Sequence, residues 1–256
     1  MIPRLYVTAD LAPGAVIAAD ARALHYLRNV MRRAKGDPLV LFNGRDGEFQ
    51  AVIAAIDKKS AEFKLGHLRR TQDSVADLWL CFAPLKKDAT DFLIEKGTEL
   101  GAAAFQPVFT QHTAATRLNL ERLESNAVEA AEQTERLTIP VIRAPLTLDD
   151  LIAGWDPARR LILCAESGAA APIADALAEL GRSVSPPNRW AIFCGPEGGF
   201  SQAELDRLAK LPFVTPVGLG PRVLRADTAA VASLAVFQST LGDGRKRPPK
   251  PIDPLS

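Results

Sequence analysis

A glycine-rich segment in the C-terminal half of the chain has the residue types of a loop that holds a ligand through its backbone. It reads GPEGG, follows the apolar run Trp190–Cys194, and precedes Ser201 and Glu204, whose spacing is that of a helix capping box. Glycines between a strand and a helix let the backbone approach a ligand closely. A P-loop would need a Lys-Ser/Thr pair and a dinucleotide-binding loop would need GxGxxG, and the segment has neither. A tight connection that binds nothing is the alternative interpretation.

A second segment, about twenty residues later, brings two arginines to the end of another apolar run. Arg222 and Arg225 are three apart in LGPRVLRADTA, outside any helical or strand pattern. Guanidinium groups in such a place bind phosphates or carboxylates, or pair with acidic side chains of the same protein. Each segment also carries a carboxylate, Glu197 in the first and Asp227 in the second. Asp227 or Thr228 is expected to cap the last helix.

Strands and helices are predicted to alternate from Asp77 onwards, which is typical of an α/β domain with a mainly parallel sheet. Open sheets of this kind bind ligands at the carboxyl ends of their strands, where both segments lie. The candidate strands are Leu78–Ala83, Phe105–Phe109, Leu161–Ala165, Trp190–Cys194 and Val214–Val217. The candidate helices are Ala89–Leu100, Leu120–Arg136, Pro172–Leu180, Gln202–Ala209 and Thr228–Leu241. These patterns alone predict an open, doubly wound sheet.

Residues 1–74 show a different pattern, that of a small β-barrel with one helix. The predicted strands are Leu5–Val7, Pro38–Asn43, Gly47–Ile56 and Ala61–Leu68, with turns at NGRDG and DKKS. The helix is predicted over Asp20–Arg33 and presents an apolar stripe beside a basic one. The two stripes consist of Leu24, Leu27 and Met31, and of His25, Arg28 and Arg32.

The distribution of charge divides the chain at the same point. Residues 1–74 carry 12 Lys and Arg against 8 Asp and Glu, whereas residues 75–240 carry 15 against 20. A basic unit joined to an acidic body suggests that the first part meets a polyanion, although an offset of this size also arises by chance. The candidates for such contacts are Arg4, Arg22, His25, Arg28, Arg32 and Arg33.

Composition excludes several classes of protein. With 47% hydrophobic and 24% charged residues, the 256-residue chain resembles a soluble globular protein, and its net charge of +1 excludes one that is basic throughout. We find no run approaching the roughly 18 apolar residues of a membrane span and no secretory signal, so we expect a cytoplasmic protein. Cys81, Cys164 and Cys194 are expected to be buried thiols, and the histidines lack metal-ligand spacing, so no metal is expected. The tail 243–256 is expected to be disordered.

Four motifs occur in a characteristic order: IEKGTELGA at Ile94–Ala102, AAEQTER at Ala130–Arg136, GPEGGFSQAE at Gly195–Glu204 and LGPRVLRADTA at Leu219–Ala229. In this order they resemble the bacterial RsmE family, the ribosomal RNA small-subunit methyltransferases E of the SPOUT class. HYLRNVMRRAKGD and LFNGRDGEFQAVI are similar to that family's PUA-like RNA-binding domain. The likeness extends to about Asp243. Asp227 stands where the family usually has Glu, and Thr110, Gln111 and His112 stand where it tends to carry Arg-Ser.

The resemblance implies a fold and a cofactor. A PUA-like barrel of residues 1–74 precedes a SPOUT domain of residues 75–242, in which the chain threads a loop to form a trefoil knot. Pattern alone does not predict a knot, because knots are so rare. The implied cofactor is S-adenosylmethionine, held by three loops in the knot. By position these loops contain Leu163 and Ala165; Gly195, Pro196, Glu197, Gly198 and Gly199; and Leu219, Gly220, Val223, Leu224 and Arg225.

The reaction implied by the resemblance is methylation of N3 of a uridine in the decoding region of 16S rRNA, by a cytoplasmic homodimer that acts on rRNA or the small ribosomal subunit. A sulfonium methyl is already electrophilic, so the protein mainly has to align a nucleophile with the S–CH₃ bond. Uridine N3 becomes nucleophilic only after its proton leaves. Arg222 and Arg225 are candidates for stabilising the uracil anion or holding a phosphate, and Glu197 and Asp227 are candidates for removing the proton.

Other roles and functions stay open at this point. Asp227 could simply cap the last helix, and Glu197 could accept backbone hydrogen bonds where the helix after Ser201 begins. A non-catalytic RNA-binding ribosome-assembly factor on the same fold would bind no cofactor, although the intact GPEGG loop argues against it. A nucleotide-dependent oxidoreductase is disfavoured by the missing dinucleotide fingerprint.

Overall fold

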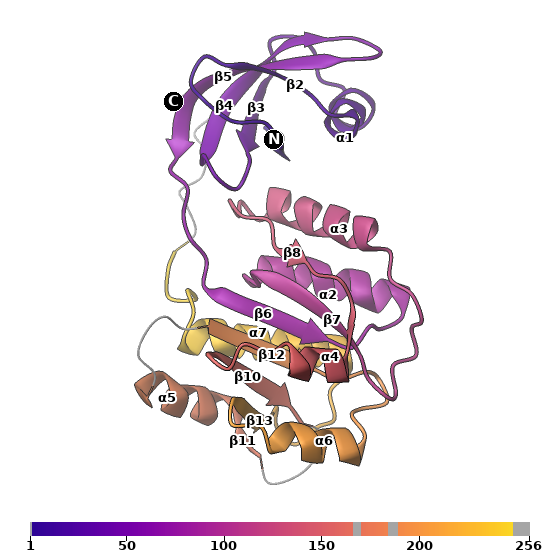
Figure 1. Cartoon of the computed structure of the whole chain (residues 1–256). Helices are drawn as coiled ribbons and strands as arrows, with labels where there is room; N and C mark the ends of the chain where they lie inside the picture. The colour runs from indigo at the N-terminus through magenta and orange to yellow at the C-terminus, as the bar shows by residue number, and fades with distance from the viewer. Residues whose placement is uncertain (1, 166–169, 184–188, 248–256) are drawn as a thin grey trace. The chain divides into compact units, whose positions relative to one another are not determined.

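The computed structural model describes residues 2–165, 170–183 and 189–247, and these form two compact units (Figure 1). The first, called the β-unit below, contains residues up to 74 together with 131–139. The second, the α/β unit, contains residues 75–130 and the described residues from 140 onwards. The segment 131–139 therefore packs with the β-unit although the sequence patterns place it among the elements of the α/β unit.

The β-unit is built on a five-stranded sheet in the order β1-β3-β4-β5-β2. Its strands are β1 (Arg4–Tyr6), β2 (Val16–Ala18), β3 (Pro38–Phe42), β4 (Glu48–Ile56) and β5 (Ala61–Arg70). Strands β1 and β3 are parallel and the other pairs are antiparallel. Register shifts interrupt the long β4–β5 ladder, and such irregularities bend a sheet. The sheet encloses an apolar core that includes Leu5, Leu27, Leu41, Phe49 and Phe63.

The helix predicted over Asp20–Arg33 is regular only in its first part. Helix α1 (Ala21–His25) begins after Asp20, whose carboxylate accepts a hydrogen bond from the Ala23 N–H. The chain then continues as a π-helix, η1 (Tyr26–Val30), in which the Met31 N–H donates to the Tyr26 carbonyl. Arg32 follows in the left-handed region with φ of 52°. Because a π turn holds one more residue than an α turn, the apolar and basic stripes are wrong as a regular helical pattern beyond Leu27.

The α/β unit confirms the predicted parallel sheet. Its strand order is β11-β13-β10-β12-β6-β7-β8, and every pair along it is parallel. The strands are β6 (Asp77–Phe82), β7 (Ala104–Phe109), β8 (Val141–Ile142), β10 (Arg159–Cys164), β11 (Ala171–Pro172), β12 (Arg189–Cys194) and β13 (Val214–Gly218), and β9 (Leu146–Thr147) pairs with β7. The sequence did not predict the two-residue strands, which have too few residues to show a pattern.

Helices cover both faces of this sheet (Figure 1). They are α2 (Lys87–Glu99), α3 (Leu120–Gln133), α4 (Leu148–Ala153), α5 (Ile173–Ser183), α6 (Gln202–Ala209) and α7 (Ala226–Thr240). Helices α4 and α6 pack in one apolar core with Leu163 and Phe193. Helix α7, which contacts α2 and α5, packs on the opposite side chains of the sheet, with Phe237 against Trp190 at 5.6 Å between ring centroids.

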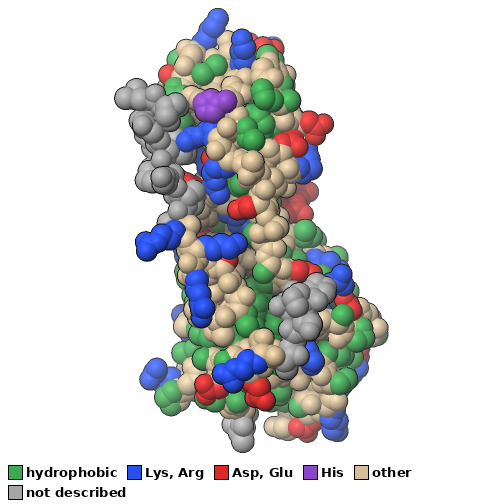
Figure 2. All heavy atoms as spheres, turned by 90° about the vertical axis from the view of Figure 1, so that its left-hand side faces the viewer, with side chains coloured by type: hydrophobic (Ala, Val, Ile, Leu, Met, Phe, Trp, Pro, Cys, Tyr) green, Lys and Arg blue, Asp and Glu red, His purple; other side chains and the backbone are tan. Residues whose placement is uncertain are grey.

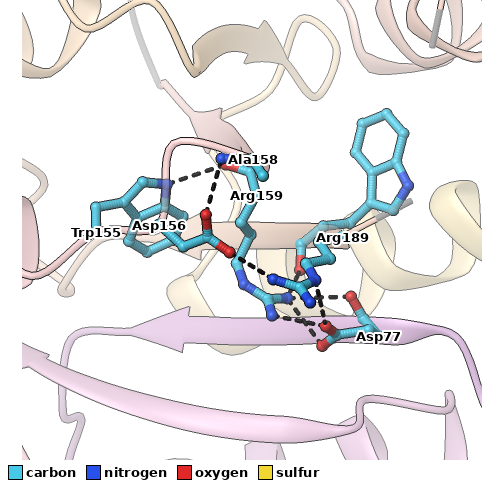
Figure 3. Close-up of polar contacts among 7 residues, drawn as sticks. Asp77, Trp155, Asp156, Ala158, Arg159 and Arg189 are labelled. Carbon is cyan, nitrogen blue, oxygen red and sulfur yellow. Dashed lines mark hydrogen bonds and ion pairs between the residues drawn. The ribbon is translucent and has the colours of Figure 1, made fainter. Parts of the chain in front are cut away.

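Charged side chains tie together the amino ends of three adjacent strands (Figure 3). Asp77 at the start of β6 accepts two hydrogen bonds from Arg159 at the start of β10, at 2.9 and 2.7 Å. Arg189 at the start of β12 donates to Asp156 at 2.8 Å, and its Nε lies 3.9 Å from the Asp77 carboxylate. The Trp155 indole N–H donates to the Arg159 carbonyl. These contacts stabilise the amino ends of the strands, which lie at the opposite edge of the sheet from the two candidate ligand-binding loops.

Charges of both signs are interspersed on the face of the molecule seen in Figure 2. No helix of the described segments has the length and apolar character that crossing a membrane requires. Of the tail expected to be disordered, residues 243–246 form turns and bends, with the Asp243 N–H donating to the Gln238 side chain, and residues 248–256 lie outside the described residues. The trefoil knot stays a prediction.

Candidate functional site

A cavity of about 300 Å³ lies at the carboxyl ends of β10, β12 and β13, beside the first turn of α7. Its size is at the lower end of the range for small-molecule sites. Small or apolar residues make up most of its lining, which consists of Cys164, Ala165, Ala170, Pro172, Cys194, Gly195, Gly218, Leu219, Gly220, Arg222, Val223, Leu224, Ala226 and Ala229. The position at the carboxyl edge is the one expected for a ligand of a parallel sheet.

The cavity brings together parts of the three loops that the resemblance implied for the cofactor. Six of the predicted cofactor-binding residues line the cavity: Ala165, Gly195, Leu219, Gly220, Val223 and Leu224. Of the predicted catalytic residues, Arg222 lines it. Among the described residues, Pro196–Gly199 and Arg225 are not part of its lining. Residues 166–169, the neighbours of Ala165, lie outside the described residues.

Leu163 does not face the cavity, because side chains alternate along a strand. It packs in the core shared with α4 and α6, whereas the next residue, Cys164, lines the cavity. Cys194 is the register partner of Cys164 on β12, and the two Sγ atoms are 3.7 Å apart. Alternation counted from the predicted Ala165 selects Leu163, so this pattern would not have identified the two cysteines. Ala226 and Ala229 were also missed, although their spacing of three puts them on one face of α7.

All three cysteines are free and buried, as predicted. The hydrogen bond that Cys194 donates to Cys164, together with burial, raises the pKa of Cys194 well above its ordinary value. Burial raises the pKa of Cys81 to about 12, against the opposing charges of Arg159 and Arg143. The Cys194 thiol in the cavity lining is therefore neutral, and the lining residue that carries a full charge is Arg222.

The loop Leu219–Arg225 leads from β13 into α7, and its end corrects one prediction. Helix α7 begins at Ala226 after Arg225, so neither Asp227 nor Thr228 is its N-cap. Asp227 lies in the first turn, where its Oδ1 accepts a hydrogen bond from the Thr228 N–H at 2.7 Å. Its Oδ2 is 3.7 Å from an Arg225 nitrogen, in an ion pair whose arginine side chain is 78% exposed. The carboxylate at Asp227 is thus held in a fixed place next to the cavity-lining Ala226.

The glycine-rich loop is held from two sides. The capping box is confirmed: Ser201 and Glu204 exchange hydrogen bonds at the start of α6. Glu204 also accepts a hydrogen bond from the backbone N–H of Gln111, at 2.8 Å. The imidazole Nδ1 of His112 lies 3.1 Å from the carbonyl oxygen of Gly199, so the turn after β7 is tied to this loop. Glu204 therefore takes the acceptor role that was considered for Glu197, which is exposed.

The prediction that Arg4 contacts a polyanion is wrong, because this arginine is buried and paired inside the β-unit. Its side chain is buried, and its Nε donates to Glu48 at 2.7 Å. Its two terminal nitrogens donate to the carbonyls of Ala131 and Arg136 at 2.7 and 2.8 Å. Burial lowers the pKa of Arg4, and the hydrogen bond and charge of Glu48 oppose this effect. Arg4 instead holds segment 131–139 in the β-unit, and the same guanidinium lies over the Phe42 ring.

The remaining basic residues predicted to contact a polyanion differ in their exposure and in their contacts with acidic side chains. Arg22 forms a two-pronged contact with Glu132 at 2.7 and 3.1 Å. Arg33 is half-buried, with a nitrogen 3.9 Å from Asp37. His25, Arg28 and Arg32 are exposed along α1 and η1. A polyanion would therefore meet mainly these last three side chains.

Comparison with known proteins identifies both units. Residues 71–238 match the model of a family described as the RNA methyltransferase domain, and residues 19–66 match the RNA methyltransferase PUA domain. The ribosomal RNA small subunit methyltransferase E of Rickettsia conorii is 33% identical over 91% of this chain and 93% of its own length. That of Synechocystis sp. is 31% identical over 94% of this chain and 78% of its own.

Solved structures show the same likeness. A putative methyltransferase from Legionella pneumophila, in complex with the bound cofactor SAM, is similar with a TM-score of 0.83 and 28% identity, over 95% of this chain and 99% of that one. A ribosomal RNA small subunit methyltransferase E from Neisseria gonorrhoeae, bound to S-adenosyl methionine, has a TM-score of 0.83 and 25% identity over the same shares. Within the described ranges, no cluster of His, Cys, Asp and Glu is suited to hold a metal. The chain belongs to the ribosomal RNA small subunit methyltransferase E family of RNA methyltransferases.

Proposed function

We propose that this protein uses S-adenosylmethionine to methylate N3 of a uridine in the decoding region of 16S rRNA. The observation that carries the proposal is the cavity at the carboxyl ends of β10, β12 and β13, within a chain whose residues 71–238 match an RNA methyltransferase domain. The similar proteins from Legionella pneumophila and Neisseria gonorrhoeae were solved with this cofactor bound.

The lining of the cavity fits such a cofactor. Gly195, Gly218 and Gly220 expose backbone to it, and a Cβ at Gly220 would meet nothing within 4 Å, so the loop leaves space for a ligand. Backbone N–H and C=O groups at close range recognise a nucleoside by hydrogen bonding. When bound, the cofactor supplies an electrophilic methyl group. The chain itself has to orient the cofactor and prepare the nucleophile.

The catalytic roles go to the charged groups around the cavity. Arg222 is exposed and lines the cavity, so its guanidinium can stabilise the anion of a uracil or bind the adjoining phosphate. Arg225 is paired with Asp227 and is the second candidate for these contacts. Asp227 and Glu197 are the carboxylates for removal of the N3 proton. Of these two, Asp227 is the better supported, because its hydrogen bond to the Thr228 N–H fixes its position.

We place the activity in the cytoplasm, where ribosomal RNA is found, and in a homodimer formed through the α/β unit. Val223 on the cavity loop is 81% exposed, and Val231 and Val236 of α7 are only partly buried. A second α/β unit would cover apolar side chains of this kind. Sedimentation at micromolar concentration tests the dimer separately from the reaction.

The reaction is tested with purified protein, labelled S-adenosylmethionine and 16S rRNA, both free and in small subunits, from a strain that lacks the protein. We expect one methyl group per rRNA and a new stop of reverse transcriptase, because N3 lies on the Watson–Crick edge. Identical stops in rRNA from the wild-type and deletion strains would contradict the assignment. Binding of rRNA without binding of S-adenosylmethionine in equilibrium dialysis would favour the non-catalytic assembly factor.

A further inference from the structure

The π-helix η1 exposes apolar side chains in the middle of a strongly basic stretch of the β-unit. Tyr26 is 36% exposed and Val30 is 59% exposed. From Ala21 to Gly36 the chain has five Lys and Arg and one His, and no Asp or Glu. A single exposed apolar residue is ordinary on a protein surface. An exposed aromatic ring and an exposed aliphatic side chain within one strongly basic stretch are a more specific combination.

The backbone holds these side chains in an irregular conformation. The Met31 N–H reaches back to the Tyr26 carbonyl, the Arg33 N–H donates to the Leu27 carbonyl at 2.8 Å, and Arg32 has a positive φ. Single π turns occur frequently at functional sites, and left-handed backbone at a residue other than glycine costs free energy. Leu27 anchors the turn in the core of the β-unit. The strained turn thus keeps Tyr26 and Val30 out of that core.

Positive groups lie in the same stretch as this exposed pair. Arg28 belongs to η1 and Arg32 follows it, and both are exposed, as Tyr26 and Val30 are. Arg28 also lies close enough to the turn between β4 and β5 for its charge to act on Asp57.

The turn between β4 and β5 adds two more cations. The Asp57 carboxylate accepts backbone hydrogen bonds from Lys59 and Ser60 at 2.7 and 2.8 Å, so it is engaged within the turn. Lys58 and Lys59 are exposed there. The β-unit therefore offers exposed cationic groups both from η1 and from the nearby turn between β4 and β5.

We propose that η1 is a stacking platform for an unpaired RNA base, in which the Tyr26 ring and Val30 contact the base while Arg28 and Arg32 contact the neighbouring phosphates. The inference rests on the proposed function and narrows the substrate to RNA with an unpaired segment next to the target. Aromatic side chains stack on any base whose face is free, whereas a duplex hides the faces of its bases. An apolar pair of this size is much too small for a stable protein interface. The surrounding charge fits a polyanion.

The test compares binding of a labelled single-stranded 12-nucleotide RNA with binding of the same strand in a duplex, by fluorescence anisotropy with the full-length protein. Wild type should prefer the single strand. Tyr26→Ala should weaken single-strand binding by about 5- to 150-fold, which is the loss expected for one stacked base. Tyr26→Phe keeps the ring and should retain the affinity. Tyr26→Leu keeps apolar bulk without an aromatic ring and should bind as weakly as Tyr26→Ala.

Salt dependence separates stacking from phosphate contact. Tyr26→Ala should lower the affinity without changing its slope against salt concentration, whereas Arg28→Ala with Arg32→Ala should flatten that slope by about 0.7 for each lost phosphate contact. Phe92→Ala is the matched control, because Phe92 is an exposed aromatic residue, 41% exposed, on α2 of the other unit. Its affinity for RNA should be that of wild type.

Two failures can be told apart. If wild type binds and methylates rRNA but Tyr26→Leu binds the single strand as Phe92→Ala does, the platform is wrong and the proposed function stands. If wild type binds neither RNA form and transfers no methyl group, the proposed function fails and the platform fails with it. A 2-aminopurine base in the RNA gives a second readout, since stacking on Tyr26 should quench its fluorescence in wild type and Tyr26→Phe only.

Discussion

Replacing Arg4 by methionine should destabilise the β-unit while leaving the stability of the α/β unit unchanged. The Arg4 and Glu48 side chains are 6% and 1% exposed, so the variant leaves a buried carboxylate without its main partner. Removing one member of a buried ion pair costs about 3 to 5 kcal/mol. Arg70, whose nitrogen lies 3.7 Å from Glu48, remains as a second partner. We therefore expect the lower end of that range, about 3 kcal/mol of the free energy of unfolding of the β-unit.

Hydrogen exchange measures this loss unit by unit. A loss of about 3 kcal/mol speeds the exchange of globally protected amides by roughly 150-fold. The effect should appear in peptides from β3 and β4 and in segment 131–139, whose Ala131 and Arg136 carbonyls lose a donor. All three tryptophans belong to the α/β unit, so tryptophan fluorescence should be unchanged and serves as an internal control.

Two further variants test whether the loss of stability comes from the buried Arg4–Glu48 ion pair. Arg28→Met changes an exposed arginine of the same unit and should alter stability by no more than about 0.5 kcal/mol. Arg4→Met combined with Glu48→Met removes both charges and should restore most of the loss, because an apolar pair of similar volume replaces a buried ion pair at little cost. A loss below about 1 kcal/mol in Arg4→Met, accompanied by weaker RNA binding, would refute the structural role and return Arg4 to the RNA contacts.

Three other predictions concern the α/β unit. Ala229→Leu, which puts a larger side chain into the cavity, should weaken S-adenosylmethionine binding roughly tenfold or more in equilibrium dialysis, whereas Ala235→Leu on the exposed side of α7 should not. In steady-state assays, His112→Ala should raise the KM for S-adenosylmethionine more than it lowers kcat, because the Gly199 carbonyl loses its contact with the imidazole. His112→Asn keeps a hydrogen-bond donor at this position and should restore the KM. The pKa of Cys81 is raised from 9.0 to about 12, so between these values the thiol is protonated in the folded state and ionised in the unfolded state. The free energy of unfolding should therefore fall as pH rises from 9 to 12, by at most about 1.4 kcal/mol per pH unit. Urea unfolding at stepped pH should show a shallower fall for Cys81→Ala, and identical slopes would contradict the burial of this thiol.

Long, strongly patterned elements were predictable from the sequence, and features that depend on distant partners were not. Helix α6 begins and ends at the predicted residues, because Ser201 and Glu204 mark its start locally. The strand β2 exists only through its pairing with β5, and its three residues are too few to show a strand pattern. The π turn at Tyr26 and the return of segment 131–139 to the β-unit also depend on packing that no local pattern records.

The candidate site was predictable as a set of loops but not residue by residue. The sequence located the loops around Ala165, Gly195 and Leu219, which follow adjacent strands of a parallel sheet. It did not distinguish Leu163 from Cys164, since the faces of a strand buried on both sides are equally apolar. The start of α7 was placed two residues late, because Asp227 is a good N-cap residue and Arg225 is not.

The neutral Cys194 thiol beside the cavity bears on the chemical durability of the protein. A cysteine attacks an alkylating agent as its thiolate and hardly at all as its thiol. S-adenosylmethionine is such an agent, and Cys164 and Cys194 line the cavity proposed to hold it. Burial and the hydrogen bond between the two sulfur atoms keep Cys194 protonated. The protein can therefore hold a reactive methyl donor next to Cys194 without losing that thiol to methylation.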